Sequence, residues 1–141
     1  MKLFLTVTRK GLAVALAAVL IIFALLSVTA SLKASAIDGS THRKRMVYIK
    51  GLNISVDEDS FTYKKTVIPK EFGSVYNNYN KLQRKAGFDL SRFKGEEVTV
   101  YTYPVLGCEK NLTLIVCDGE IIGGDISEVS VNGEMLPLKG K

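Results

Sequence analysis

The longest run of apolar positions in the chain lies near its start, at residues 11–32. These 22 residues contain no charged side chain, and a helix of this length would extend about 33 Å, enough to cross the hydrocarbon core of a bilayer. The pattern predicts a transmembrane anchor at residues 11–32, after a short cytoplasmic basic tail at residues 1–10. A linker at residues 33–42 and one domain at residues 43–141 are expected to follow.

A secretory signal peptide is the alternative interpretation of the same stretch. Ala34, Ser35 and Ala36 match the small-residue pattern of a cleavage site, and cleavage after Ala36 would release the domain. The apolar run is longer than the roughly 7–15 residues of a typical signal sequence, which favours an uncleaved anchor. Basic residues flank the run on both sides, so they do not decide its orientation. Because the run lies so near the N-terminus, we expect a single-pass protein of the cell membrane with its domain outside the cytoplasm.

The pattern after the linker predicts a helix and then a hairpin. In residues 43–52 apolar side chains recur at helical spacing, and Asn53 is suited to end that helix in a left-handed conformation. Apolar and polar residues then alternate in residues 54–56 and again in residues 61–68. An acidic turn separates these two stretches, as is typical of a β-hairpin.

The clearest amphipathic helix is predicted over residues 69–86, where apolar positions recur at i, i+3, i+4 and i+7. Pro69 suits its first turn and Gly87 suits the position that follows its last turn. A single helical turn is expected next, in residues 89–95. The residues expected to face the core are Phe72, Val75, Tyr76, Tyr79, Leu82 and Ala86.

The last third of the chain alternates like a β-meander. Residues 97–106 are rich in Val, Thr and Tyr, and residues 112–117 alternate between two sets of side chains. The dipeptides at residues 118–119 and 132–133 are Asp-Gly and Asn-Gly, both typical of two-residue hairpin turns. In the strand expected over residues 120–131, the inward-facing apolar side chains switch from even to odd positions between Ile126 and Val129. This switch predicts a β-bulge near residues 123–125.

These elements together predict an α+β domain in the order α-β-β-α-β-β-β-β. We expect its helices to pack on one face of a single, mainly antiparallel sheet. About a hundred residues are enough to bury one modest hydrophobic core.

Most of the net charge of +5 comes from residues outside the domain. Four of the 19 cationic residues flank the apolar run, which leaves 15 cationic against 14 acidic residues beyond residue 36. A nucleic-acid partner is therefore not expected, because it would need a basic face on the domain itself. Arg43, Lys44 and Arg45 form the one basic cluster. It is interpreted as a solvated patch close to the membrane, with contact to anionic lipid headgroups as the functional alternative.

The sequence offers little for catalysis. His42 is its only histidine, and no nucleophile, zinc, P-loop or dinucleotide motif is present. Cys108 and Cys117 lack metal or redox spacing and are expected to be free thiols rather than a disulfide. Asp125 follows two glycines and could hold a carboxylate near a ligand, but a bulge or turn is the favoured interpretation. We therefore expect no cofactor, no metal ion and no enzymatic activity.

The run IPKEFGSVYNNYNKLQRKAGFDLSRFKG, the strand VTVYTYPV and the later IIGGD resemble the uncharacterised family called domain of unknown function 4830. The resemblance extends over about residues 45–138, and its strongest motif is YNxLQxxxGFDL. It implies a small single-pass or exported protein of Gram-positive bacteria. It brings no catalytic residues to transfer.

Three functions remain open. The first is a non-catalytic extracytoplasmic domain that binds an envelope protein or component through a sheet face or edge. Tyr101 and Tyr103 are its candidate exposed aromatic residues, although burial on the second face of a covered sheet explains them equally well. The second is a regulatory or inhibitory module that acts on an envelope sensor or peptidase. The third, a small secreted enzyme, would need a deep pocket with convergent titratable groups.

Overall fold

The structure is a computed structural model, and it describes residues 36–130 and 133–138. The chain divides into two compact units, residues 1–36 and 37–141, and every described helix and strand belongs to the second. The predicted tail and the predicted anchor at residues 11–32 lie outside the described residues, as does Asn132. Neither helix in the described ranges has the length and apolar character needed to span a bilayer.

The domain alternates strands and helices before it ends in an antiparallel meander. Its elements are β1 (Ile37–Asp38), α2 (His42–Gly51), β2 (Thr62–Val67), α3 (Ser74–Lys85), the 3-10 helix η1 (Leu90–Phe93), β3 (Glu97–Pro104), β4 (Lys110–Cys117), β5 (Glu120–Glu128) and β6 (Met135–Pro137).

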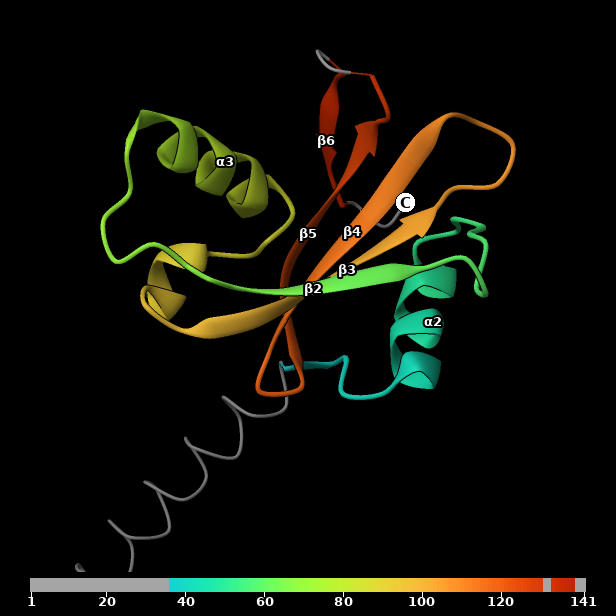
Figure 1. The fold of residues 1–141 in the computed structure, drawn as a ribbon, viewed down its shortest axis with the longest axis horizontal. Coiled ribbons are helices and arrows are strands. Elements are labelled where there is room, and N and C mark those ends of the chain that lie inside the picture. Colours follow the sequence, from blue (N-terminus) through green and yellow to red (C-terminus); the bar gives the residue numbers. More distant parts are fainter. Residues whose placement is uncertain (1–35, 131–132, 139–141) are drawn as a thin grey trace, which may run out of the picture. The chain divides into compact units, whose positions relative to one another are not determined.

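The six strands form one antiparallel sheet in the order β1-β5-β4-β3-β2 (Figure 1). Two strands pair with the same edge of β5: β1 pairs with Glu120 and Ile121 at its start, and β6 pairs with residues 125–127 further along. The β4–β5 turn has positive φ at Asp118 (47°) and Gly119 (82°), as a type I′ turn requires, so the predicted hairpin is confirmed. The register shifts between Ile115 and Val116, which leaves Ile122 as the extra residue of a bulge. The bulge thus lies one residue before the predicted segment.

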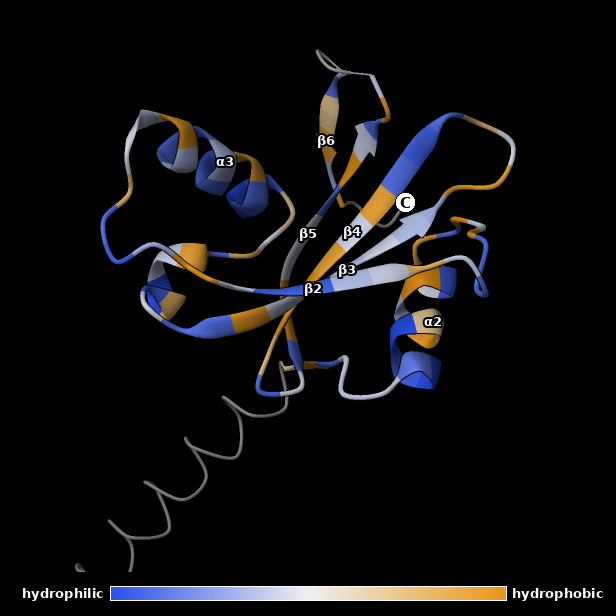
Figure 2. Cartoon of the chain, viewed as in Figure 1, coloured by the Kyte–Doolittle hydropathy of each residue, from blue (hydrophilic) through white to orange (hydrophobic). Residues whose placement is uncertain are grey.

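The two helices cover opposite faces of this sheet, so the expectation that they share one face is wrong (Figure 1). On one face Met46 and Ile49 of α2 pack in a core cluster with Leu112 and Leu114 of β4. On the other face Tyr76 and Tyr79 of α3, together with Leu90 and Phe93 around η1, pack against Ile115, Cys117 and Ile122. Strand β4 is apolar at both odd and even positions because it is covered on both sides. Figure 2 shows apolar positions in the central strands, whereas β2 is mostly polar.

The first predicted hairpin does not form. Residues 54–56 contribute only an isolated bridge from Val56 to Val105, and β2 pairs instead with β3, whose residues lie 30 to 40 positions later. Part of the predicted linker belongs to the sheet, because Ile37 and Asp38 form β1. The predicted helix at residues 43–52 is confirmed as α2, and it ends before Asn53, whose φ is 58°.

Helix α3 begins at Ser74, five residues later than Pro69. Its predicted inward face is confirmed in part, because Tyr76, Tyr79 and Ala86 pack against the core. Val75, expected in the core, is 82% exposed, whereas Asn80 and Gln83 are buried. The end of the helix was predicted correctly. Gly87 adopts φ 90° and donates its N–H to the Arg84 carbonyl, while Phe88 N–H bonds the Gln83 carbonyl, which is a Schellman motif.

Candidate functional site

Three of the residues singled out in the sequence meet on the α2 side of the sheet. The Arg45 guanidinium lies over the Tyr101 ring, with Cζ 3.6 Å from the ring centroid. Its Nε donates a hydrogen bond of 2.9 Å to the Tyr103 hydroxyl, and its Nη1 donates one of 2.9 Å to the Gly39 carbonyl. Arg45 therefore joins helix α2, strand β3 and the segment after β1.

Local structure explains why these side chains meet. Thr41 caps α2 by accepting a hydrogen bond from the Lys44 N–H, so the helix begins at His42 and turns Arg45 toward the sheet. Tyr101 and Tyr103 are two residues apart on β3, so both side chains lie on the same face.

The other two members of the basic cluster do not reach this site. Arg43 and Lys44 are exposed, and Lys44 forms an ion pair with Asp38. Tyr103 is fully buried, which agrees with the second of the two interpretations that the sequence left open, and Tyr101 is half-buried. Arg45 is 4% exposed, so it is not part of the solvated patch that the sequence predicted.

Arg45 carries a buried positive charge that lies beyond 4.0 Å of every carboxylate in the described residues. Its compensation comes from the Tyr101 π face and two oxygen acceptors, and a desolvated cation–π contact contributes about 2 kcal/mol. Burial raises the pKa of Tyr103, while the hydrogen bond and charge of Arg45 act against that increase.

More aromatic rings surround this arginine than the sequence indicated. The His42 and Phe61 rings stack with centroids 4.9 Å apart, Phe61 lies 5.4 Å from Tyr103, and Tyr63 lies 6.0 Å from Tyr101. The β2–β3 register places Tyr63 opposite Tyr101, so a correct strand pairing would have revealed the contact. We call these five rings, from His42, Phe61, Tyr63, Tyr101 and Tyr103, the aromatic cluster.

Strand β2 forms an open edge of the sheet next to this cluster. All six of its residues are exposed, including Tyr63 at 68% and Val67 at 54%, and it pairs only with β3 among the described strands. The Ile68 N–H bonds the Glu96 carbonyl at 2.9 Å. Backbone direction alternates along an antiparallel strand, so Tyr63, Lys65 and Val67 direct their N–H and C=O groups away from β3.

A second group of polar side chains is buried on the α3 side. The Tyr79 hydroxyl donates a hydrogen bond of 2.7 Å to the Asp125 carboxylate, which is 3% exposed. Burial raises the pKa of Asp125, and burial together with the Asp125 charge raises the pKa of Tyr79. Gln83 lies beside this pair and bonds the Gly124 N–H. These hydrogen bonds link α3 to β5 within the core, so the role that the structure supports for Asp125 is structural.

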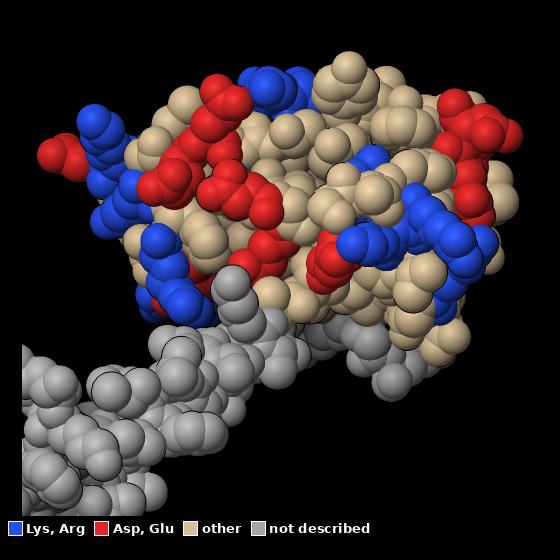
Figure 3. Space-filling view, turned by 90° about the horizontal axis from the view of Figure 1, so that it is seen from below, with Lys and Arg blue, Asp and Glu red and all other residues tan. Residues whose placement is uncertain are grey.

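The described residues show no metal centre, and the face drawn in Figure 3 carries charges of both signs. No group of three or more His, Cys, Asp or Glu side chains in residues 36–130 and 133–138 could hold a metal ion. In Figure 3, cationic and anionic residues are interspersed around uncharged ones on the face shown. Both cysteines are free thiols, as predicted, with Cys108 exposed and Cys117 buried.

Comparison with known proteins identifies one family. Residues 52–126 match the family model described as Domain of unknown function (DUF4830), which is more than half of the 141 residues. The match contains β2, α3, β3 and β4, and it leaves Arg45 and His42 outside. No curated protein and no solved structure matches the chain.

Proposed function

The chain belongs to the DUF4830 family, and we propose that its domain is a non-catalytic binding module of the bacterial cell envelope. In this proposal an extended, acidic segment of a partner protein adds to the sheet at the open edge of β2. The observation that carries the proposal is that all six residues of this strand are exposed beside the aromatic cluster.

Backbone hydrogen bonds would supply the affinity. The N–H and C=O groups that Tyr63, Lys65 and Val67 turn outward are those that a further strand would pair with. Tyr63 adds an exposed aromatic side chain on the α2 side of the edge, supported from behind by Tyr101. Aromatic residues of this kind often anchor a protein interface.

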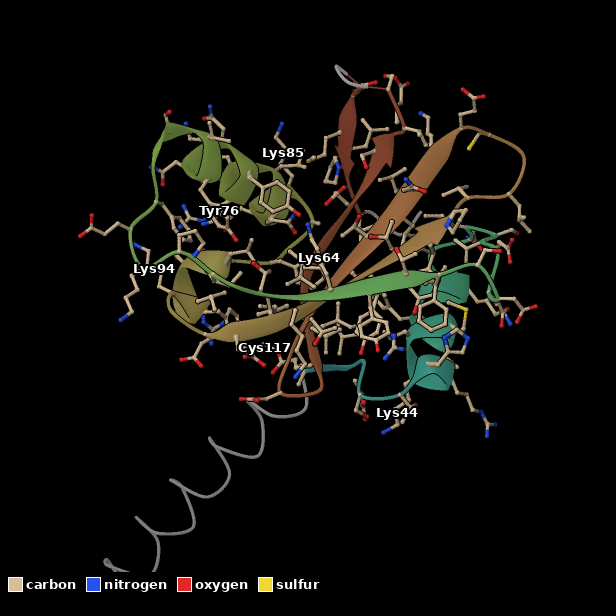
Figure 4. All side chains as sticks on the ribbon, viewed as in Figure 1. Lys44, Lys64, Tyr76, Lys85, Lys94 and Cys117 are labelled. Carbon is tan, nitrogen blue, oxygen red and sulfur yellow. The ribbon has the colours of Figure 1, made fainter. Side chains whose placement is uncertain are left out.

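The charge of the edge favours an acidic partner. Lys64 projects from β2 toward the side of α3 (Figure 4) and lies beyond 4.0 Å of any carboxylate in the described part of the chain. Lys65 has one weak, exposed partner, Glu97, at 3.4 Å. Acidic side chains on an added strand would lie beside both lysines.

The same charges argue against a second copy of this chain as the occupant. If two β2 strands paired about a two-fold axis through their centre, Lys65 or, in the other register, Lys64 would lie directly opposite the same lysine of the second copy. Like charges directly opposite each other destabilise strand pairing, and lysines are a common protection of edge strands against self-association.

The envelope location rests on the apolar stretch at residues 11–32. That stretch supports a single-pass anchor with the domain outside the cytoplasm, as the sequence predicts. Protease added to wall-free intact cells should then degrade the domain. If the domain is degraded only after lysis, the proposed location is wrong.

Strand addition can be tested with the full-length chain in mild detergent and a fluorescein-labelled peptide, Thr-Val-Glu-Glu-Val-Val-Thr, whose adjacent glutamates project to opposite faces of the strand. We expect saturable binding by fluorescence anisotropy, with NMR shifts at the amides of Tyr63, Lys65 and Val67. Lys65→Pro should abolish binding because it removes an outward N–H, and proline is tolerated at such edge positions. Lys65→Ala keeps the N–H and should weaken binding about two- to threefold.

Lys44→Ala is the matched control, because it removes one exposed, ion-paired lysine near β1, at the opposite edge of the sheet from β2, and should leave binding unchanged. A melting curve by circular dichroism checks that Lys65→Pro folds. If it does not, the Lys65→Ala result and the amide shifts decide. Equal binding by the folded proline variant, or the absence of saturable binding to the wild type, refutes the proposal.

A further inference from the structure

A cavity of about 330 Å³ lies between α3 and η1, apart from the β2 edge. Asn77, Lys81 and Arg84 follow each other at i, i+4 and i+7 on α3 and form one wall. Ser91 and Lys94 line it from the η1 side, and Phe72 also contributes to the lining. Its volume is at the lower end of the range for small-molecule sites.

The lining of this cavity has an excess of positive charge. Lys81 and Lys94 lie beyond 4.0 Å of all carboxylates in the described residues, and Arg84 pairs with Asp89 at 3.1 Å. The Asp89 carboxylate also accepts hydrogen bonds from Asn80 at 2.9 Å and from Ser91 at 2.6 Å. Its charge is thus already used to hold α3 and η1 together, and two ammonium groups remain uncompensated.

The lining is also held in place before any ligand arrives. The Lys94 ammonium lies 4.7 Å from the centroid of the Phe72 ring, a cation–π contact that fixes its position. The Asn77 amide donates a hydrogen bond of 3.1 Å to the Phe72 carbonyl. A ligand would therefore meet a Lys94 ammonium that has already lost part of its conformational freedom.

We infer that this cavity binds a phosphate monoester group, carried either by a small soluble molecule or by a lipid headgroup. A phosphate monoester carries up to two negative charges near neutral pH, which matches the two uncompensated ammonium groups. The N–H groups of Arg84 that do not contact Asp89 add donors of the geometry that phosphate prefers. The Phe72 ring is placed to contact the apolar part of the ligand.

The test uses the full-length chain in detergent and follows thermal unfolding by circular dichroism, since a ligand that binds the folded state raises the melting temperature. The probes are phenyl phosphate in solution, and micelles doped with phosphatidic acid or with phosphatidylcholine. At ten times its dissociation constant, phenyl phosphate should raise the melting temperature by about 5 °C. The two doped micelles distinguish a lipid source from a soluble one.

The double variant Lys81→Gln/Lys94→Gln should bind phenyl phosphate at least about tenfold more weakly, because it removes two charge-assisted contacts. The matched control, Lys64→Gln/Lys85→Gln, changes the net charge equally at two lysines that do not line the cavity (Figure 4). It should bind as the wild type does.

A shift with phenyl phosphate that depends on Lys81 and Lys94 supports a soluble phosphate monoester. A shift only with phosphatidic acid, with the same dependence, supports a lipid headgroup. Equal shifts in the double variant and its control, or no shift with either probe, overturn the inference.

Discussion

The side-chain Oε1 of Gln83 accepts a hydrogen bond of 2.8 Å from the backbone N–H of Gly124. Strand β1 pairs with β5 at Ile121 and β6 pairs with it from Asp125 onward, so the N–H of Gly124 lies in the gap between them. The amide of Gln83, fully buried on α3, supplies the partner that no strand provides there. This bond is a direct polar link between α3 and the sheet.

Replacing this amide should destabilise the domain. Gln83→Leu has a similar volume but no acceptor, so the buried Gly124 N–H would lose its partner, at a cost of about 1–3 kcal/mol. Urea unfolding measures the loss, and hydrogen exchange at the Gly124 amide locates it. An amide that stays as protected in the variant as in the wild type would show that the bond does not matter.

Arg45 should be needed for the packing of α2 against β3. Arg45→Met keeps most of the volume but leaves the Gly39 carbonyl and the Tyr103 hydroxyl without their donor, which should cost about 2 kcal/mol. Arg45→Lys keeps the charge and should lose less. Denaturant unfolding of the three proteins measures their free energies of unfolding, which should fall from the wild type to Arg45→Lys to Arg45→Met. An Arg45→Met variant as stable as the wild type would contradict this prediction.

Asp125 should make the domain less stable as the pH rises. Burial raises its pKa above its ordinary value, so the folded state binds this proton more tightly than the unfolded state does. By linkage, its contribution favours folding most below about pH 4 and is lost as the pH rises through the folded pKa. Asp125→Asn can still accept the Tyr79 hydrogen bond, so it should be more stable than the wild type at pH 7.

The difference between these two proteins should shrink as the pH approaches 4. Comparing the two proteins is needed because Asp38, Asp57 and Asp89 have lowered pKa values, chiefly through side-chain hydrogen bonds. Their contribution to the stability of the fold is therefore lost as the pH falls, which is opposite to the effect of Asp125. Unfolding free energies at pH 4 and pH 7 give the result. A constant difference would mean that the Asp125 carboxyl does not change its charge on folding.

The cysteines should differ sharply in reactivity under reducing-agent-free conditions. Cys108 is exposed, whereas Cys117 is 6% exposed and burial raises its pKa, which lowers its thiolate fraction. A thiol reagent should therefore modify one cysteine rapidly in the native protein and the second only with urea. Peptide mapping identifies the site, with Cys108→Ser as the control, and rapid loss of the Cys117 peptide would contradict the buried position.

Local sequence signals predicted most elements correctly. Helix α2, η1 and the β4–β5 hairpin follow from caps, spacing and turn residues that act within a few positions. The failures concern long-range pairing. Phe61 and Tyr63 were predicted to be in a strand, but nothing nearby indicates that their partner is β3 rather than residues 54–56.

The site shows the same division. Tyr101, Tyr103 and Arg45 were noticed for their residue types, but only the register and the capped start of α2 bring them together. Asn80 and Gln83 were not recognised as buried because polar side chains at helical spacing normally indicate a solvated face. Their burial depends on partners more than eight residues away, on η1 and β5.

Strand β1, which pairs with β5 through only two residues, gives the domain a mechanical asymmetry. Tension applied to the chain ahead of Ile37 would load these two pairs and the Gly39–Gly119 hydrogen bond first. They lie at the opposite edge of the sheet from β2, with three strands between. Under such a pull the β1 pairs should therefore separate before strand β2 at the far edge is disturbed.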